Sequence, residues 1–94
     1  MNILFTCAGR RTYLLNYFRE NLTKNDTILA TDMSLTAPAL QAADVKIQVS
    51  AVYSEGYIDS LIDICRVHTV DVLISLNDLE LPILAHQKKR FAEV

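Results

Sequence analysis

Four short runs of aliphatic and β-branched residues alternate with longer helical patterns along this chain of 94 residues. The runs are bounded by polar residues, as buried strands are, and they cover residues 3–7, 27–31, 45–49 and 70–74. Strands that alternate with helices form a parallel sheet with right-handed crossovers, because each helix returns the chain to the same end of the sheet. The pattern therefore predicts an α/β fold with a four-stranded parallel sheet of strand order 3-2-1-4.

Apolar residues at helical spacing predict the connecting helices, which cover both faces of the sheet. Residues 12–22 and 54–68 have one apolar face each, and Ser54 is a candidate N-cap for the second of these helices. Residues 35–43 are rich in alanine and predict a short helix of about two turns. The last helix is expected over residues 80–93, since Pro82 is tolerated only in a first turn.

Composition excludes several classes of protein. The chain is 51% hydrophobic with two cysteines, which argues against disorder and against a disulfide scaffold. A net charge of −2 argues against nucleic-acid binding. The apolar runs are shorter than the ~20 residues that cross a bilayer, and no signal peptide fits the N-terminus, so we expect a cytoplasmic protein without membrane contact. His68 and His86 lack partners at ligand spacing, and no metal site is expected.

The chain is expected to be one domain over residues 1–94 and the N-terminal fragment of a longer protein. Residues 91–94 carry no glycine or proline that would end the last helix. A four-stranded parallel sheet also leaves two open edges, which would allow the chain to form a homo-oligomer.

The turn after the first strand is the first candidate site. Gly9, Arg10 and Arg11 lie where that strand leads into a helix, and free backbone N–H groups and the helix dipole favour an anion there. Two arginines oppose the dipole unless a carboxylate or phosphate binds them. They are therefore either part of an anion-binding turn or two solvated side chains. A dinucleotide fingerprint needs two further glycines, so Asp32 is interpreted as a turn residue.

The second candidate site follows the fourth strand. Asp78 and Glu80 lie in residues 75–82, at the same carboxyl edge as the first turn. Strands 1 and 4 are neighbours in the predicted order, and the order reverses between them, which is where ligands bind in open α/β sheets. The two acids could face Arg10 or Arg11 across one cleft as a substrate cradle. Helix capping explains the same acids, and both roles can hold together.

Cys7 raises a rival function. Residues 4–9 resemble the opening of low-molecular-weight tyrosine phosphatases, which use a cysteine thiolate in a phosphate-binding loop. That family has an arginine six positions after the cysteine, and this chain has Tyr13 there. The other interpretation is that Cys7 is a small, buried strand residue. Tyr53 and Tyr57 are interpreted as packing residues near a helix start.

Several segments, in order, resemble one family over nearly the whole chain. Residues 2–11 are similar to the opening strand and turn of ATP-grasp proteins of the carbamoyl-phosphate-synthase type, and residues 77–85 to their exit from strand 4. Residues 30–44 resemble the second strand and short helix of these proteins, and residues 57–61 with 70–74 also fit.

The resemblance implies a pre-ATP-grasp domain, a Rossmann-like N-terminal module. Enzymes of this kind activate a carboxylate as an acyl phosphate with ATP and Mg²⁺, and an amine then attacks it. The resemblance places ATP and Mg²⁺ in a downstream ATP-grasp domain, so this chain would hold no cofactor or catalytic residue and would be inactive alone. Its substrate-side residues, for a small carboxylate or phosphate, would be Gly9, Arg10, Arg11, Asp78 and Glu80. A hydrolase using Cys7 and a non-enzymatic α/β binding module remain the alternatives.

Overall fold

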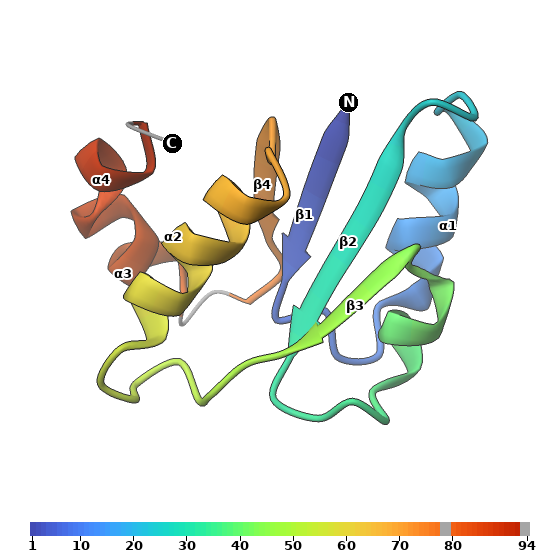
Figure 1. The fold of residues 1–94 in the computed structure, drawn as a ribbon. Coiled ribbons are helices and arrows are strands. Elements are labelled where there is room, and N and C mark those ends of the chain that lie inside the picture. The colour runs from blue at the N-terminus through green and yellow to red at the C-terminus, as the bar shows by residue number, and fades with distance from the viewer. Residues whose placement is uncertain (78–79, 93–94) are drawn as a thin grey trace.

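The predicted parallel sheet is present in the computed structural model, which describes residues 1–77 and 80–92 (Figure 1). Its strands are hydrogen-bonded in the order β3-β2-β1-β4, and all three neighbouring pairs are parallel. The α/β class and the strand order are therefore confirmed, and the architecture is that of a Rossmann-like domain. The strands are β1 (Asn2–Thr6), β2 (Thr27–Asp32), β3 (Val45–Gln48) and β4 (Val72–Ser75).

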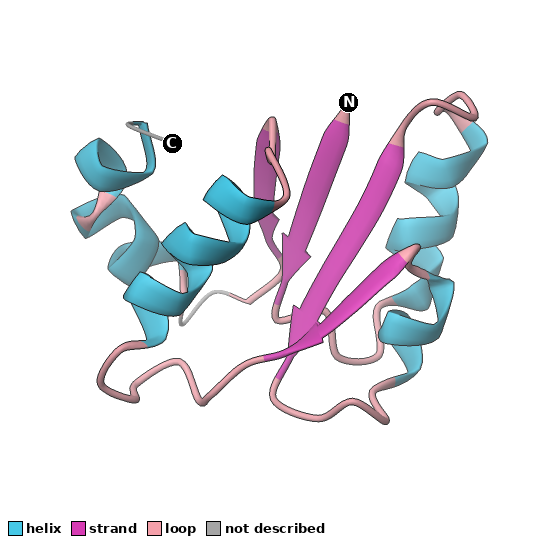
Figure 2. Cartoon of the chain, in the orientation of Figure 1, coloured by secondary structure: helices cyan, strands magenta, loops and turns pink. Residues whose placement is uncertain are grey.

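Helices cover both faces of the sheet, as predicted (Figure 2). One face carries α1 (Thr12–Glu20) and the 3₁₀ helix η1 (Pro38–Ala42), which takes the place of the short helix expected over residues 35–43. The other face carries α2 (Tyr57–Val67), α3 (Leu81–His86) and α4 (Lys88–Ala92). None of the helices in the described part of the chain has the length and hydropathy needed to span a membrane.

Side-chain alternation along β1 divides the core between the two faces. Ile3 and Phe5 are buried toward the first face, where they pack with Leu15 of α1. Leu4 points to the opposite face and packs with Cys65 of α2. Since successive strand residues face opposite sides of a sheet, a strand of five residues can serve both core layers at once.

The same alternation brings hydroxyl side chains to the carboxyl end of the sheet, on the α2 face. Thr6 ends β1, and its register partner on β4 is Ser75. Thr31 on β2 lies one residue beyond the Phe5–Ala30 pair, and so it faces the same side as Thr6. We call Thr31, Thr6 and Ser75 the hydroxyl row; it lies directly beneath the loops that leave the strands.

The start of α2 differs from the prediction, and Ser54 is not its N-cap. The N-cap is Gly56, with a φ of +84°, and its carbonyl accepts the first helical N–H, from Ser60. Glycine adopts this left-handed conformation without the strain that a Cβ would bring. The carbonyl of Ser54 instead accepts the N–H of Tyr57 within the preceding turn.

The prediction of a single helix over residues 80–93 is also wrong for the described part of this range. That part forms two helices, α3 and α4, with Gln87 between them. The N–H of Arg90 binds the carbonyl of Gln87, three residues earlier, which is the tighter 3₁₀ pattern. Beyond this break, Phe91 packs against the core layer of Leu4. Pro82 lies in the first turn of α3, as its missing N–H requires.

Candidate functional site

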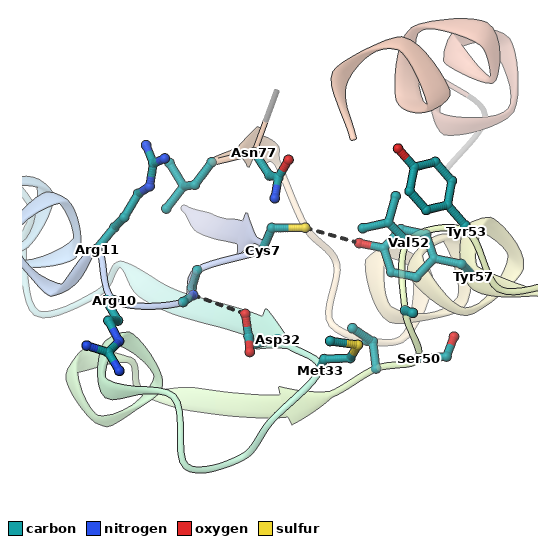
Figure 3. Close-up of a pocket in the computed structure, with 15 residues that line it drawn as sticks. Cys7, Arg10, Arg11, Asp32, Met33, Ser50, Val52, Tyr53, Tyr57 and Asn77 are labelled. Atoms are coloured by element: carbon teal, nitrogen blue, oxygen red, sulfur yellow. Dashed lines mark hydrogen bonds between the residues drawn. The ribbon is translucent and has the colours of Figure 1, made fainter. Parts of the chain in front are cut away.

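A cavity of about 440 Å³ opens at the carboxyl end of the sheet. Its walls come from the turn after β1, the end of β2, the loop from β3 to α2, and the loop after β4; the lining residues are 7–11, 32–33, 49–53, 57 and 76–77. The turn at Gly9 and the loop at Asn77 therefore border one cavity, as the predicted strand order required (Figure 3). This is the place where open α/β sheets bind ligands, because the chain leaves neighbouring strands 1 and 4 in opposite directions.

The turn at Gly9 is held in place by hydrogen bonds to β2 and η1. The N–H of Ala8 lies 3.1 Å from the carbonyl of Thr31, and the N–H of Gly9 lies 3.1 Å from Oδ1 of Asp32. The carbonyl of Gly9 accepts the N–H of Ala39 at 2.9 Å. Gly9 has a φ of +53°, a conformation that glycine tolerates best. The interpretation of Asp32 as a turn residue is confirmed, since its Oδ2 also accepts the N–H of Ser34.

Arg10 and Arg11 follow this turn and are exposed at one side of the cavity, while Tyr53 and Tyr57 lie at the other (Figure 3). Arg11 is the N-cap of α1, and the first turn of this helix has neither a side-chain cap nor an acidic residue. Among the described residues, neither arginine forms an ion pair. The positive end of the helix dipole and two unpaired guanidinium groups thus meet at one rim, and this combination attracts anions.

Metal binding has no support in the part of the chain that the structure describes. No three His, Cys, Asp or Glu side chains gather there closely enough to hold an ion. Asp32 is the only acid that lines the cavity among these residues, and backbone N–H groups occupy both of its oxygens. The described residues therefore do not fit Mg²⁺, and we assign them no metal chemistry.

Comparison with protein families decides the kind of domain. A family model described as the N-terminal domain of PylC-like proteins matches residues 3–94. The chain belongs to this family. A PylC-like N-terminal domain is a pre-ATP-grasp domain, so the resemblance to that class is confirmed. The narrower resemblance to carbamoyl-phosphate synthases remains a prediction. A comparison with curated proteins gives no match.

Glu80 of this PylC-like domain lies behind the cavity wall. Its side chain is fully buried, and its carboxylate accepts hydrogen bonds from the hydroxyls of Thr6, Ser75 and Tyr57. Of these residues Tyr57 lines the cavity, and Glu80 does not. Any contribution of Glu80 to substrate binding is therefore expected to act through Tyr57. Asp78, the other predicted acid, lies outside the described residues.

Cys7 is not a buried strand residue, so that interpretation is wrong. It follows β1 with a φ of +53°, lines the cavity and is only partly buried. Burial, with the nearby charge of Glu80, raises the pKa of its thiol to about 11. A thiol with this pKa stays protonated near neutral pH and is a poor nucleophile. The site of this PylC-like domain therefore disfavours a hydrolase based on Cys7.

Tyr57 is the residue whose importance sequence reasoning missed, because it was interpreted as packing alone. It is buried at the start of α2, and its hydroxyl contacts both Glu80 and Cys7. Burial and then Glu80 raise the pKa of this hydroxyl, which keeps it protonated as a donor. A buried tyrosine normally needs a hydrogen-bond partner, and this rule was the available signal. It could not name the partner, because that depends on how α2 packs against the loop after β4.

Proposed function

We propose that this domain forms the substrate side of an ATP-grasp carboxylate–amine ligase similar to the carbamoyl-phosphate synthase large subunit. The cavity would bind the anionic group, a carboxylate or a phosphate, of a small substrate. Gly9, Arg10 and Arg11 would receive that anion, and a downstream ATP-grasp domain would supply the ATP and Mg²⁺ site. By this proposal the chain contributes no catalytic residue of its own.

One observation carries the proposal. Two exposed arginines without ion-pair partners among the described residues lie at the uncapped N-terminus of α1, and they border the same cavity as the loop after β4. An isolated helix gains nothing from basic residues at this end, since they repel the dipole. A bound anion reverses the sign of that interaction, because each guanidinium can donate charge-assisted hydrogen bonds to it.

The residues of this chain would bind and orient the substrate. Arg10 and Arg11 would pair with its anionic end at the rim next to α1 (Figure 3). Met33 and Val52 are apolar parts of the wall and would exclude water from the body of the substrate. The hydrogen bonds that hold the turn at Gly9 keep the arginines in place before the substrate arrives, which reduces the entropy lost on binding.

An NMR titration of the ¹⁵N-labelled chain tests this proposal, with inorganic phosphate and succinate as probes. We expect shifts of the amide signals in residues 9–13 and at Asn77, and we expect R10A/R11A to weaken binding at least about tenfold, as the loss of charge-assisted hydrogen bonds implies. The matched control is K88A/K89A, which removes the same charge from the exposed side of α4. Equal weakening in both variants would mean non-specific screening and would contradict the proposal.

Two further assays address the other functions. Tight binding of ATP by this chain alone would contradict the assignment of ATP to a downstream domain. Hydrolysis of an aryl phosphate that disappears in C7S would establish the phosphatase alternative. If phosphate binds through Arg10 and Arg11 while the full-length protein couples no amine to a carboxylate, the domain is a binding module.

A further inference from the structure

One buried carboxylate joins the elements that lead into the cavity. Glu80 precedes α3 and accepts hydroxyl hydrogen bonds from Thr6 at the end of β1, from Ser75 at the end of β4, and from Tyr57 at the start of α2. Thr6 and Ser75 are register partners, so Glu80 spans two members of the hydroxyl row. A change at Glu80 would reach three walls of the cavity together.

The hydrogen bonds along this wall have a defined direction. Tyr57 has a single hydroxyl proton, which it donates to Oε2 of Glu80. The sulfur of Cys7 lies 3.7 Å from the Tyr57 oxygen (Figure 3), and the thiol must be the donor there because the phenol proton is already used. The chain of donors therefore runs from the Cys7 thiol to Tyr57 and then to Glu80.

Tyr57 also separates the charge of Glu80 from the cavity. Tyr57 and Cys7 line the cavity, whereas the Glu80 side chain is fully buried behind them. A ligand at this wall would meet a phenol oxygen and a neutral thiol. The repulsion between a carboxylate and an anionic ligand falls with distance, so the ring makes the wall compatible with an anion at the far rim.

We infer that Glu80 is a positioning residue, which shapes the cavity wall by holding Tyr57 and, through Tyr57, the Cys7 thiol. What this means for a ligand depends on the proposed function, whereas the hydrogen-bonded chain can be tested without any ligand. The groups that face the thiol are Tyr57 and Glu80 on the α2 side and Asp32 at the end of β2, while the exposed Arg10 and Arg11 follow in its own turn.

The rate at which iodoacetamide alkylates Cys7 tests the chain of hydrogen bonds. A C65S background leaves Cys7 as the sole thiol, since the protein has two cysteines. The rate is followed by mass spectrometry between about pH 7 and pH 12, because it rises with the thiolate fraction and levels off only above the thiol pKa of about 11. A shift of the whole profile along the pH axis reports a change in pKa. Greater exposure of the thiol would instead raise the rate by the same factor at all pH values, including the plateau at which the thiol is fully ionised.

E80Q should lower the pKa of Cys7, because it removes the nearby negative charge, and so it should raise the rate near neutral pH about tenfold. The matched control is E55Q, which removes an exposed charge from the loop before α2 and should leave the profile unchanged. Equal profiles for E80Q and E55Q would overturn the inference. An alkylation rate that E80Q raises by the same factor at every pH would also overturn the inference, since loosened packing around the thiol would then explain the result.

Y57F provides the second variant and changes no charge. It removes the acceptor of the Cys7 thiol, and so it should shift the alkylation profile along the pH axis. In a Y57F background E80Q should have a smaller effect, because the part that acts through Tyr57 is lost while the direct effect of the Glu80 charge remains. If E80Q fails to fold, Y57F alone decides: an unchanged profile would overturn the inference.

Phosphate binding separates this inference from the proposed function. With both arginines intact, Y57F should weaken phosphate binding about three- to tenfold, because the wall is no longer held in place. Unchanged phosphate affinity in Y57F would overturn the claim that the wall matters to the ligand. Unchanged phosphate affinity in R10A/R11A would instead refute the proposed function. It would not affect the inference about the hydrogen bonds from Cys7 to Glu80, which the alkylation rates test.

Discussion

The backbone N–H of Gly9 donates a hydrogen bond to Oδ1 of Asp32 across 3.1 Å, which ties the turn after β1 to the end of β2. The second carboxylate oxygen of Asp32 accepts the N–H of Ser34, also at 3.1 Å. One side chain thus holds the backbone of both loops that border this part of the cavity. The turn that we propose to bind an anion depends on this carboxylate, although the carboxylate carries the same charge as the proposed ligand.

Substitution of Asp32 by alanine should lower the free energy of unfolding by about 1–2 kcal/mol, since two backbone donors lose a charged acceptor. D32N should lose less, because its amide oxygen can still accept the N–H of Gly9. Urea denaturation measures both, and hydrogen exchange at the Gly9 amide should become faster in D32A. D63A is the control, since among the described residues the Asp63 side chain forms only an exposed ion pair within α2. Equal losses in D32A and D63A would contradict this role for Asp32.

Two neighbouring threonines of the hydroxyl row should respond to valine in opposite directions. Thr6 and Thr31 are both fully buried. The Thr6 hydroxyl donates a hydrogen bond to the carboxylate of Glu80. In the described part of the chain, the Thr31 hydroxyl has no hydrogen-bond partner. T31V should raise the free energy of unfolding by about 1 kcal/mol because it removes a buried group without a hydrogen bond, and T6V should lower it by about 1–3 kcal/mol.

Urea denaturation of the two variants measures this difference, and each serves as the control for the other. The exchange of a hydroxyl for a methyl group is the same in both, so general effects of valine on a strand cancel. A destabilised T31V would mean that its hydroxyl does have a partner in solution.

R10A/R11A should be more stable than the wild-type chain in the absence of ligand. Both arginines oppose the dipole of α1 at its N-terminus, and their removal should raise the free energy of unfolding by about 0.5–1 kcal/mol at low ionic strength. The gain should shrink at high salt, since both side chains are exposed. Urea denaturation at two NaCl concentrations tests this. R66A is the control, because Arg66 lies in the last turn of α2, where the dipole favours a cation.

Greater stability together with weaker phosphate binding would show that these arginines serve a ligand rather than the fold. A double variant less stable than the wild-type chain at low salt would count against the proposed repulsion between these arginines and the dipole of α1.

Asp26 makes stability depend on pH in the acid range. The N-terminal ammonium of Met1 donates to its carboxylate at 2.7 Å, and this bond, with the N–H of Thr23, lowers the pKa of Asp26 to about 2. A depressed pKa stabilises the folded chain above the ordinary value of 3.8, and the contribution is lost as the pH falls through about 2.

D26N should therefore be less stable than the wild-type chain at pH values between about 5 and 7, and the two should converge as the pH approaches about 2. Urea midpoints across this range measure the difference, with an untagged N-terminus so that the ammonium is present. The difference in urea midpoint between the control D63N and the wild-type chain should not change with pH. A gap between D26N and wild type that is constant with pH would contradict the role of the Asp26 carboxylate.

The strand order was predictable from the sequence because hydrophobic patterning is local. Alternation through Ile3, Leu4 and Phe5, and the helical spacing around Leu15, decide which side of each element is buried, and right-handed crossovers leave few ways to connect such elements. The same logic placed the turn at Gly9 beside the loop at Asn77. Boundaries were less predictable, because the start of α2 depends on the left-handed conformation of Gly56 rather than on the nearby Ser54.

The partners of buried polar groups could not be read from the sequence. Glu80 was expected to contact a substrate, to cap a helix, or to do both; no local pattern indicated that its carboxylate binds a hydroxyl that lies 74 residues earlier, on Thr6, and another that lies 23 residues earlier, on Tyr57. Such contacts depend on strand register and helix packing, and no local spacing encodes either.

The sequence by itself determined the α/β class, the order of the strands and the edge of the sheet where the cavity opens, since these follow from periodic burial of apolar residues over short stretches. Only the tertiary structure decided that Glu80 lies behind the cavity wall and that Cys7 and Tyr57 form its surface. The physical reason is that a buried polar group must find its hydrogen bonds among whatever groups the packed chain brings within reach.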